Sequence, residues 1–215
     1  IEGTTERLLL PRIMKMIDEE QLEDKRLGSQ YVSVMEVGGA YAHIFFDLLE
    51  FLELRALIIT DIDTVKLNNN GRYVSCHLQE GQKTSNACIK HWFDDPDVAP
   101  TYLLAMEEAQ KISGKRRLAF QQPEEKDGPC GRSFEDAFML ANTDLFPFSG
   151  LSMDEREAVA WQTAKDVKKS EFALQYALNV PEWKIPRYIR DGLVWLAEND
   201  MPPLTIVPLS AKFVA

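Results

Sequence analysis

Long apolar runs are absent from this sequence. No stretch approaches the roughly 18 consecutive apolar residues that a membrane-spanning helix needs. The chain also opens at Ile1-Glu2-Gly3 without a signal-like segment. We therefore expect no membrane partner and a cytoplasmic location. Because a helix begins almost at once and no methionine precedes it, we also expect the chain to be a piece of a longer polypeptide.

Cysteine is scarce, with only Cys76, Cys88 and Cys130 among 215 residues. An odd number without a regular spacing argues against a disulfide-stabilised secreted domain and suits a reducing compartment. The pairs Cys76-His77 and Cys88-x-x-His91 have an irregular spacing, and adjacent ligands are awkward for a tetrahedral zinc ion. The spacing does not favour a zinc site.

Positive charge is in short supply, because 24 Lys and Arg face 34 Asp and Glu, which leaves a net charge of −10. A protein that binds nucleic acid through its phosphates normally presents a basic surface. Acidic residues that hold divalent cations would reverse that local charge. The sign of the net charge therefore does not decide whether this protein binds nucleic acid.

The apolar residues that are present predict an α/β fold. Residues 56–60 form a short apolar run typical of a strand buried on both faces, and residues 31–37 and 117–121 predict further strands. Helical patterns run from Thr4 through Pro11, which should kink or restart that helix, and from residue 40 to 52. This alternation predicts a parallel sheet flanked by helices.

The later part of the chain differs in pattern. Residues 67–100 predict a long loop or insert, with a short helix capped within Thr84-Ser85-Asn86, and a helix follows over 101–112. Beyond Gly150 the pattern is helical, with a capping box at Ser152 that opens a long helix to about residue 178 and a last helix over 187–197. We expect a catalytic core over residues 1–148 and a helical subdomain over 149–215, which ends in Pro202-Pro203 and an apolar tail.

Acidic side chains gather where the predicted strands end. Asp61 and Asp63 follow the buried strand directly, and Glu2 and Glu6 lie four residues apart, on one face of the first helix. Carboxylates at the carboxyl ends of parallel strands meet at one edge of the sheet, where ligands bind. Oxygen ligands of this kind suit Mg²⁺, so we predict a metal site there.

Taken with their order along the chain, these residues resemble the Toprim domain, which has a glutamate after its first strand and a DxD motif after its third. Longer segments resemble the overcoming-lysogenization-defect (OLD) family of nucleases over nearly the whole chain. These segments are Glu2-Gly3-Thr4-Thr5-Glu6, Val37-Gly38-Gly39, Thr60-Asp61-Ile62-Asp63, Thr84-Ser85-Asn86, Gly131-Arg132-Ser133-Phe134-Glu135-Asp136, Lys169-Ser170-Glu171-Phe172-Ala173 and Pro186-Arg187-Tyr188-Ile189-Arg190-Asp191-Gly192-Leu193.

The resemblance implies a DNA endonuclease or nickase that uses Mg²⁺ or Mn²⁺, with two ions expected. It also implies an N-terminal ABC-type ATPase domain on the same polypeptide; no GxxxxGK[ST] loop occurs here, so this chain would be the nuclease half without an ATP site. Carried over by position, Glu2, Asp61 and Lys169 would be catalytic. The metal ligands would be Glu2, Glu6, Asp61, Asp63, Ser133 and Glu135.

Other interpretations stay open. Asp61-Ile62-Asp63-Thr64-Val65 is also similar to the nucleophile motif of haloacid-dehalogenase-like phosphatases, with Asp94-Asp95 as the acidic pair, although that motif ends the first strand of its domain. A non-catalytic Toprim module that binds DNA or a partner is a third possibility. Taken alone, Glu2 and Glu6 fit the positive end of a helix dipole, and Ser133 with Asp136 fits a capping box.

Basic residues on the later helices are candidate contacts to the DNA backbone, namely Lys168, Arg187 and Arg190. The motif Lys115-Arg116-Arg117 and Lys184 are further candidates. A solvated helix face explains each of these residues at least as well.

Overall fold

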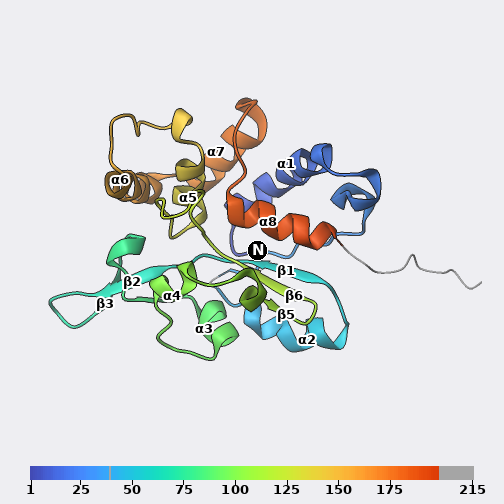
Figure 1. Cartoon of the computed structure of the whole chain (residues 1–215), viewed down its shortest axis with the longest axis horizontal. Coiled ribbons are helices and arrows are strands. Elements are labelled where there is room, and N and C mark those ends of the chain that lie inside the picture. Colours follow the sequence, from blue (N-terminus) through green and yellow to red (C-terminus); the bar gives the residue numbers. More distant parts are fainter. Residues whose placement is uncertain (39, 199–215) are drawn as a thin grey trace, which may run out of the picture.

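A computed structural model describes residues 1–38 and 40–198. The fold is mixed α/β, as expected, with helices on both sides of a small central sheet (Figure 1). The helices are α1 (Thr4–Glu20), α2 (Phe46–Phe51), α3 (Ala87–Phe93), α4 (Pro100–Leu104), α5 (Phe134–Ala141), α6 (Met153–Asp166), α7 (Lys169–Leu174) and α8 (Arg187–Ala197). The strands are β1 (Ala56–Ile59), β2 (Thr64–Leu67), β3 (Tyr73–Ser75), β4 (Lys83–Thr84), β5 (Ile112–Ser113) and β6 (Arg116–Ala119).

The central sheet has the strand order β1-β6-β5. Strands β1 and β6 are parallel, with Ala56 opposite Arg116 and Ile59 opposite Ala119, whereas β5 is antiparallel to β6. The predicted parallel sheet is therefore confirmed for this one pair of strands. Because β1 and β6 run the same way, the residues that follow them meet at one edge of the sheet.

Side chains alternate between the two faces of this sheet, so each face has its own core. Ile59 and Ala119 face a cluster built from α1, α5, α7 and α8, while Ile58 and Leu118 face a cluster with α2, α3 and α4. The helix α8 lies close on the first face, where a Cβ at Gly192 would come within 2.9 Å of a Leu57 methyl carbon. A larger residue at this position would require the Leu57 side chain to shift.

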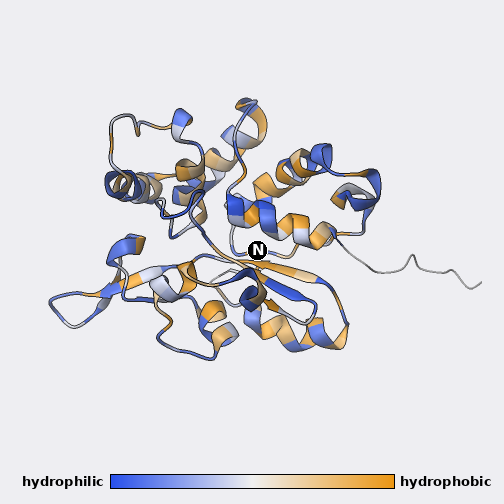
Figure 2. Cartoon of the chain, in the orientation of Figure 1, coloured by the Kyte–Doolittle hydropathy of each residue, from blue (hydrophilic) through white to orange (hydrophobic). Residues whose placement is uncertain are grey.

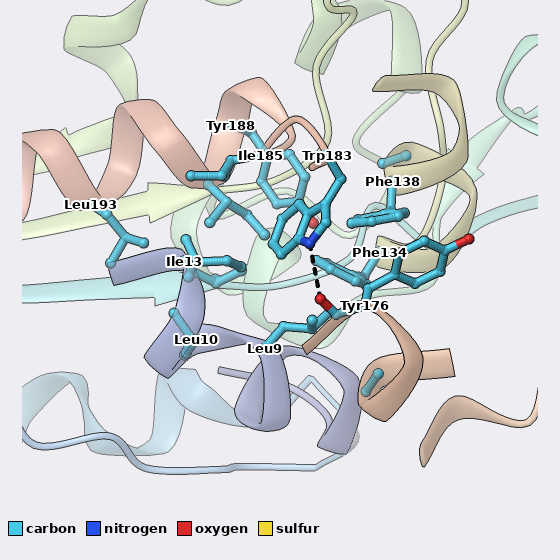
Figure 3. Close-up of a cluster of buried hydrophobic side chains, with 14 of the residues drawn as sticks. Leu9, Leu10, Ile13, Phe134, Phe138, Tyr176, Trp183, Ile185, Tyr188 and Leu193 are labelled. Carbon is cyan, nitrogen blue, oxygen red and sulfur yellow. Dashed lines mark hydrogen bonds between the residues drawn. The ribbon is translucent and has the colours of Figure 1, made fainter. Parts of the chain in front are cut away.

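Aromatic side chains dominate the first core, where α1, α5 and α8 converge (Figure 3). Phe138 on α5 packs against Tyr176 with ring centroids 4.6 Å apart and against Trp183 at 5.2 Å. The Trp183 indole N–H donates to the Tyr176 carbonyl at 2.9 Å, so the polar atom of this buried ring is satisfied. Leu9 and Ile13 of α1 belong to the same cluster. The helices of the predicted subdomain thus share one core with the first helix of the chain.

Several sequence predictions need correction. Residues 31–37 are extended but form no strand. Among the described residues their backbone partner is Ile1, which forms hydrogen bonds with Met35 and Val37. Two hydrogen bonds to one residue are too few to make a strand pair. The predicted helix over 40–52 is reduced to a 3₁₀ turn and α2. Helix α1 begins after Gly3, not at a threonine cap, and runs through Pro11 without interruption.

The predicted long loop over 67–100 is the largest departure. It contributes to a second, antiparallel sheet of order β3-β2-β4, followed by α3 and α4. Asn86 caps α3 as expected. The predicted helix over 101–112 is divided, because α4 ends at Leu104 and a 3₁₀ turn at Glu108–Lys111 precedes β5.

In the C-terminal part, α8 has the predicted bounds and Ser152 forms the predicted capping box. The prediction of one long helix to residue 178 is wrong, because the observed helix α6 ends at Asp166. A new helix, α7, starts at Lys169 and continues into a π-helical turn, Gln175–Asn179. This break places Lys169 at a helix start. The tail with Pro202-Pro203 lies outside the described residues. No helix in the described part is long and apolar enough to cross a membrane.

Candidate functional site

The loop of residues 60–63 lies at the carboxyl edge of the central sheet and connects β1 to β2. Asp63 adopts a left-handed backbone conformation with φ of 51°, which an aspartate tolerates better than most residues. Its N–H donates to the Arg132 carbonyl at 3.1 Å, and its carbonyl accepts from the Ser85 N–H at 2.9 Å. The loop is therefore held from both sides, by the entry to α5 and by the segment before α3.

Asp61 is nearly buried and is oriented by Gln121, which follows β6 and is fully buried. The Gln121 side-chain carbonyl accepts from the Ile62 N–H at 2.8 Å, and its NH₂ donates to Asp61 Oδ1 at 2.5 Å. Because the carbonyl end is engaged by a backbone donor, the amide can present only its NH₂ to Asp61. The same NH₂ lies 3.3 Å from the hydroxyl of Tyr188 on α8.

Glu2 lies against the same loop, just before α1. Its Oε2 accepts from the Thr60 hydroxyl at 2.6 Å, the Asp61 N–H at 3.2 Å and the Asn86 side-chain NH₂ at 3.4 Å. Asn86 also donates to the Asp61 carbonyl at 2.7 Å while its own oxygen caps α3 by accepting from the Ile89 N–H. One asparagine thus joins the inserted helix to Glu2 and to the DxD loop.

Glu6 and Glu135 complete the acidic cluster from two helix starts. Glu6 is one turn into α1 and only 4% exposed, and a Cβ at Gly3 would lie 3.1 Å from its Oε2, so a glycine there leaves room for the carboxylate. Glu135 lies in the first turn of α5 and is also buried. Its Oε1 accepts from the Thr5 hydroxyl at 2.7 Å and lies 3.4 Å from Lys169 Nζ.

Burial and mutual repulsion raise the pKa values of three of these acids. Burial, with the charges of Glu135 and Glu2, raises the pKa of Glu6 to about 7 despite a backbone hydrogen bond. Burial, with the charges of Glu6 and Asp63, holds the pKa of Asp61 well above its ordinary value. The pKa of Asp63 is also raised, chiefly by burial. Like charges disfavour mutual ionisation, so the site lacks positive charge.

Two cations partly offset the cluster. Burial opposes the charged form of Lys169, yet Glu135, Asp61 and Glu6 raise its pKa above the ordinary lysine value. Arg132 forms an ion pair with Asp63, with Nη2 and Oδ1 2.7 Å apart. Five carboxylates therefore face two cationic side chains, which leaves room for added positive charge.

The donor set fits a hard divalent cation, because the acids offer only oxygen ligands, the type that Mg²⁺ and Mn²⁺ prefer. As the side chains lie, no three Asp, Glu, His or Cys residues in the described part of the chain converge closely enough to hold an ion. Four of the five acids accept hydrogen bonds from side chains instead, Glu2 from Thr60, Asp61 from Gln121, Asp63 from Arg132 and Glu135 from Thr5. Metal binding would require these side chains to exchange protein donors for the ion.

The other predicted site residues lie apart from this cluster. Ser133 donates to Asp136 at 3.0 Å in a capping box, so its hydroxyl has the structural role that the sequence also allowed. Each of the predicted DNA contacts lies in an ion pair: Lys168 with Glu171, Arg187 with Asp191 and Arg190 with Glu20. The Lys115-Arg116-Arg117 side chains are likewise paired, with Glu53, Glu50 and Glu108.

Sequence reasoning missed the neutral and cationic residues that orient the acids. These are Thr5, Thr60, Asn86, Gln121, Arg132 and Tyr188. Gln121 could have been found, because it follows a strand parallel to the one that Asp61 follows. Nothing in the sequence pattern indicates that Thr5 or Tyr188 would reach the site.

In the metal-free state, stability should fall as pH rises from about 5 to 8. The folded pKa of Glu6 is about 7 against 4.5 in an unfolded chain, so the folded state holds the extra proton between these values and loses that advantage above them. A shift of this size corresponds to roughly 3 kcal/mol in the free energy of unfolding. Urea unfolding in EDTA at several pH values measures it; Glu6→Gln should flatten the dependence, as should saturating Mg²⁺. Stability that rises over this range would contradict the prediction.

Comparisons with known proteins gave two sequence matches. Residues 1–63 match the family described as overcoming lysogenization defect protein-like, TOPRIM domain. The curated protein Endonuclease GajA of Bacillus cereus (strain HuB5-5) is 26% identical over 226 residues; the match covers 93% of this chain but 31% of that protein, so the chain spans about a third of its relative's length. No solved structure matches. The matched segment, residues 1–63, contains Glu2, Glu6, Asp61 and Asp63, and over this segment the chain is similar to the OLD-like Toprim domain.

Proposed function

We propose that this chain is the nuclease part of a larger enzyme and hydrolyses phosphodiester bonds in DNA with Mg²⁺ or Mn²⁺. The observation that carries the proposal is that Glu2, Glu6, Asp61, Asp63 and Glu135 lie near one edge of the sheet, where Lys169 Nζ is 3.4 Å from Glu135 Oε1. Buried like charges destabilise a fold unless something compensates them. Divalent cations bound between these acids would compensate their mutual repulsion and could also bind a phosphate.

The roles of the residues follow from their environment. Glu2, Glu6, Asp61, Asp63 and Glu135 would hold two divalent ions, and Ser133 could join them only by leaving Asp136. When bound, such ions supply an activated water and stabilise the leaving oxygen. Lys169 can place its ammonium against a non-bridging phosphate oxygen, since its side chain is 60% exposed while its Nζ faces Glu135. Gln121 orients the Asp61 carboxylate through its hydrogen bond to Oδ1.

The relative supports the same reading, since its printed name describes an endonuclease. An N-terminal ABC-type ATPase domain on the same polypeptide belongs to this proposal, as does a catalytic core over residues 1–148. The helical region over 149–215 would not act separately, because it supplies Lys169 to the site.

The direct test is cleavage of supercoiled plasmid by the purified chain. We expect nicked or linear product with Mg²⁺ or Mn²⁺ and none in EDTA, because charge at the scissile phosphate would be uncompensated without the ions. Conversion is followed on agarose gels over time. Cutting that persists in EDTA would contradict the proposal, as would intact plasmid with either metal.

A phosphatase is the second candidate, and its motif requires Asp61 as a free nucleophile. In the structure Asp61 Oδ1 is held by Gln121, while the proposed acidic pair Asp94-Asp95 is exposed at the end of α3. No contact joins that pair to Asp61 within the described residues. Turnover of a chromogenic phosphomonoester would support the phosphatase; DNA binding without any metal-dependent cutting would support a non-catalytic module.

A further inference from the structure

The hairpin formed by β2 and β3 projects away from the body of the molecule (Figure 1). All three residues of β3 are exposed, and Leu67 and Tyr73, which are paired across the hairpin, are each about half exposed. β3 is the edge strand of its sheet. An exposed edge ribbon of this kind is available to a partner.

The charge of this ribbon is opposite to that of the whole chain. Residues 64–79 contain no aspartate or glutamate, in a protein with 34 acids among 215 residues, and they carry Arg72 and Lys66, of which Lys66 pairs with Glu80 just beyond the ribbon. Among the described residues Arg72 has no ion pair, whereas Lys83 on β4, whose Nζ lies 4.2 Å above the Tyr73 ring, pairs with Asp97. Arg72 is therefore the cation of this ribbon that is free for a partner. The tip is hydrophilic (Figure 2). A polyanion is the partner that this surface fits.

The tip of the hairpin, residues 68–72, is a turn fixed by its own hydrogen bonds. The Asn68 side-chain oxygen accepts from the N–H groups of Asn70 and Arg72 at 2.9 and 3.0 Å, and the Asn68 N–H donates to the Arg72 carbonyl at 2.8 Å. Gly71 has φ of 71°, the left-handed conformation that glycine adopts without strain. The side chains of Asn69 and Asn70 are thus exposed on a preorganised loop, which lowers the entropy cost of binding.

The base of the hairpin directly adjoins the candidate active site. Strand β2 starts at Thr64, directly after Asp63, and Thr64 is fully buried, with its hydroxyl donating to the Cys76 carbonyl at 2.7 Å. At about 3.3 Å per strand residue, the tip lies within roughly 20 Å of the DxD loop. At 3.4 Å per base pair, that distance is about five or six base pairs of duplex.

We propose that the β2–β3 hairpin is the arm through which this enzyme contacts duplex DNA beside the cut. This inference rests on the proposed nuclease function and names the DNA-contact surface that the paired cations Lys168, Arg187 and Arg190 do not provide. A two-stranded ribbon fits the major groove, where asparagine amides can contact base edges and an arginine can contact a phosphate. The acid-free arm offsets the repulsion between DNA and the acidic body of the protein.

The test compares Arg72→Glu with Lys25→Glu in the complete chain. Lys25 is exposed in a short 3₁₀ turn after α1, so both variants make the same change in charge. Binding to a fluorescent 30-base-pair duplex is measured by anisotropy in Ca²⁺, and nicking kinetics are measured in Mg²⁺. Thermal unfolding of both variants establishes that they remain folded.

We expect Arg72→Glu to weaken binding at least tenfold and to raise KM by a similar factor, with kcat within twofold of wild type and Lys25→Glu unchanged. The slope of log affinity against log salt should fall by about one, the signature of one lost phosphate contact. Arg72→Lys should recover most of the affinity. A photoreactive group at Tyr73 should crosslink to DNA about five base pairs from the cut.

Two results would overturn the inference. If wild type binds and nicks DNA but Arg72→Glu behaves as Lys25→Glu does, the hairpin is not the arm, and the nuclease proposal stands. If wild type neither binds nor nicks DNA with Mg²⁺ or Mn²⁺, the nuclease proposal fails and the arm fails with it.

Discussion

Asp61→Asn should reduce plasmid nicking by at least about a thousandfold, because the substitution removes a charged ligand from the centre of the acidic cluster. Loss of one group that stabilises charge in the transition state costs roughly 10²–10³ in rate, and loss of a metal ligand adds to this. Initial rates of nicking in Mg²⁺ measure the effect. The Asn side chain keeps the shape of Asp61, and its oxygen can still accept from Gln121.

The same variant should not lose stability. In the metal-free protein, burial and the charges of Glu6 and Asp63 raise the pKa of Asp61, so its ionised form disfavours the fold at neutral pH. Removing that charge should keep or raise the melting temperature measured in EDTA. Asp94→Asn, at an exposed aspartate at the end of α3, is the control for the same chemical change and should leave nicking unchanged. Normal nicking by Asp61→Asn would disprove its catalytic role.

Lys169→Gln should lower the nicking rate about a hundredfold, since its ammonium lies 3.4 Å from Glu135 and interacts with Asp61. The change should appear in kcat more than in KM if this charge acts on the transition state. Initial rates of nicking, measured over a range of DNA concentrations, separate kcat from KM. Lys168→Gln, at the adjacent exposed lysine that pairs with Glu171, is the control and should retain near wild-type activity.

The stability of Lys169→Gln should change in the direction opposite to that of Asp61→Asn. Removing the lysine leaves Glu135 and its acidic neighbours less compensated, so the melting temperature in EDTA should fall, and Mg²⁺ should recover part of it. Two inactive variants with opposite shifts in metal-free stability would show that both residues belong to one electrostatic cluster. A loss of stability in Asp61→Asn equal to that in Lys169→Gln would contradict this picture.

The helices that carry their own start signals were predictable from local sequence. Ser152 opens α6 through a capping box, Asn86 caps α3, and α8 has its predicted bounds. Strand predictions succeeded only where a partner strand exists. Residues 56–59 pair with β6, whereas residues 31–37 have an equally suitable pattern but meet only Ile1. A strand depends on a neighbour that may be distant in sequence, which local pattern does not specify.

The sequence alone predicted the acids of the candidate site, because Glu2, Asp61 and Asp63 match a motif in order and the family resemblance adds Glu6 and Glu135. The hydrogen-bond partners of these acids emerge only from the three-dimensional structure. Gln121 on Asp61, Asn86 on Glu2 and Thr5 on Glu135 join segments 60, 84 and 130 residues apart. Hydrogen-bond partners of this kind depend on how β1, β6 and three helix starts pack at one edge of the sheet, and no local pattern encodes that packing.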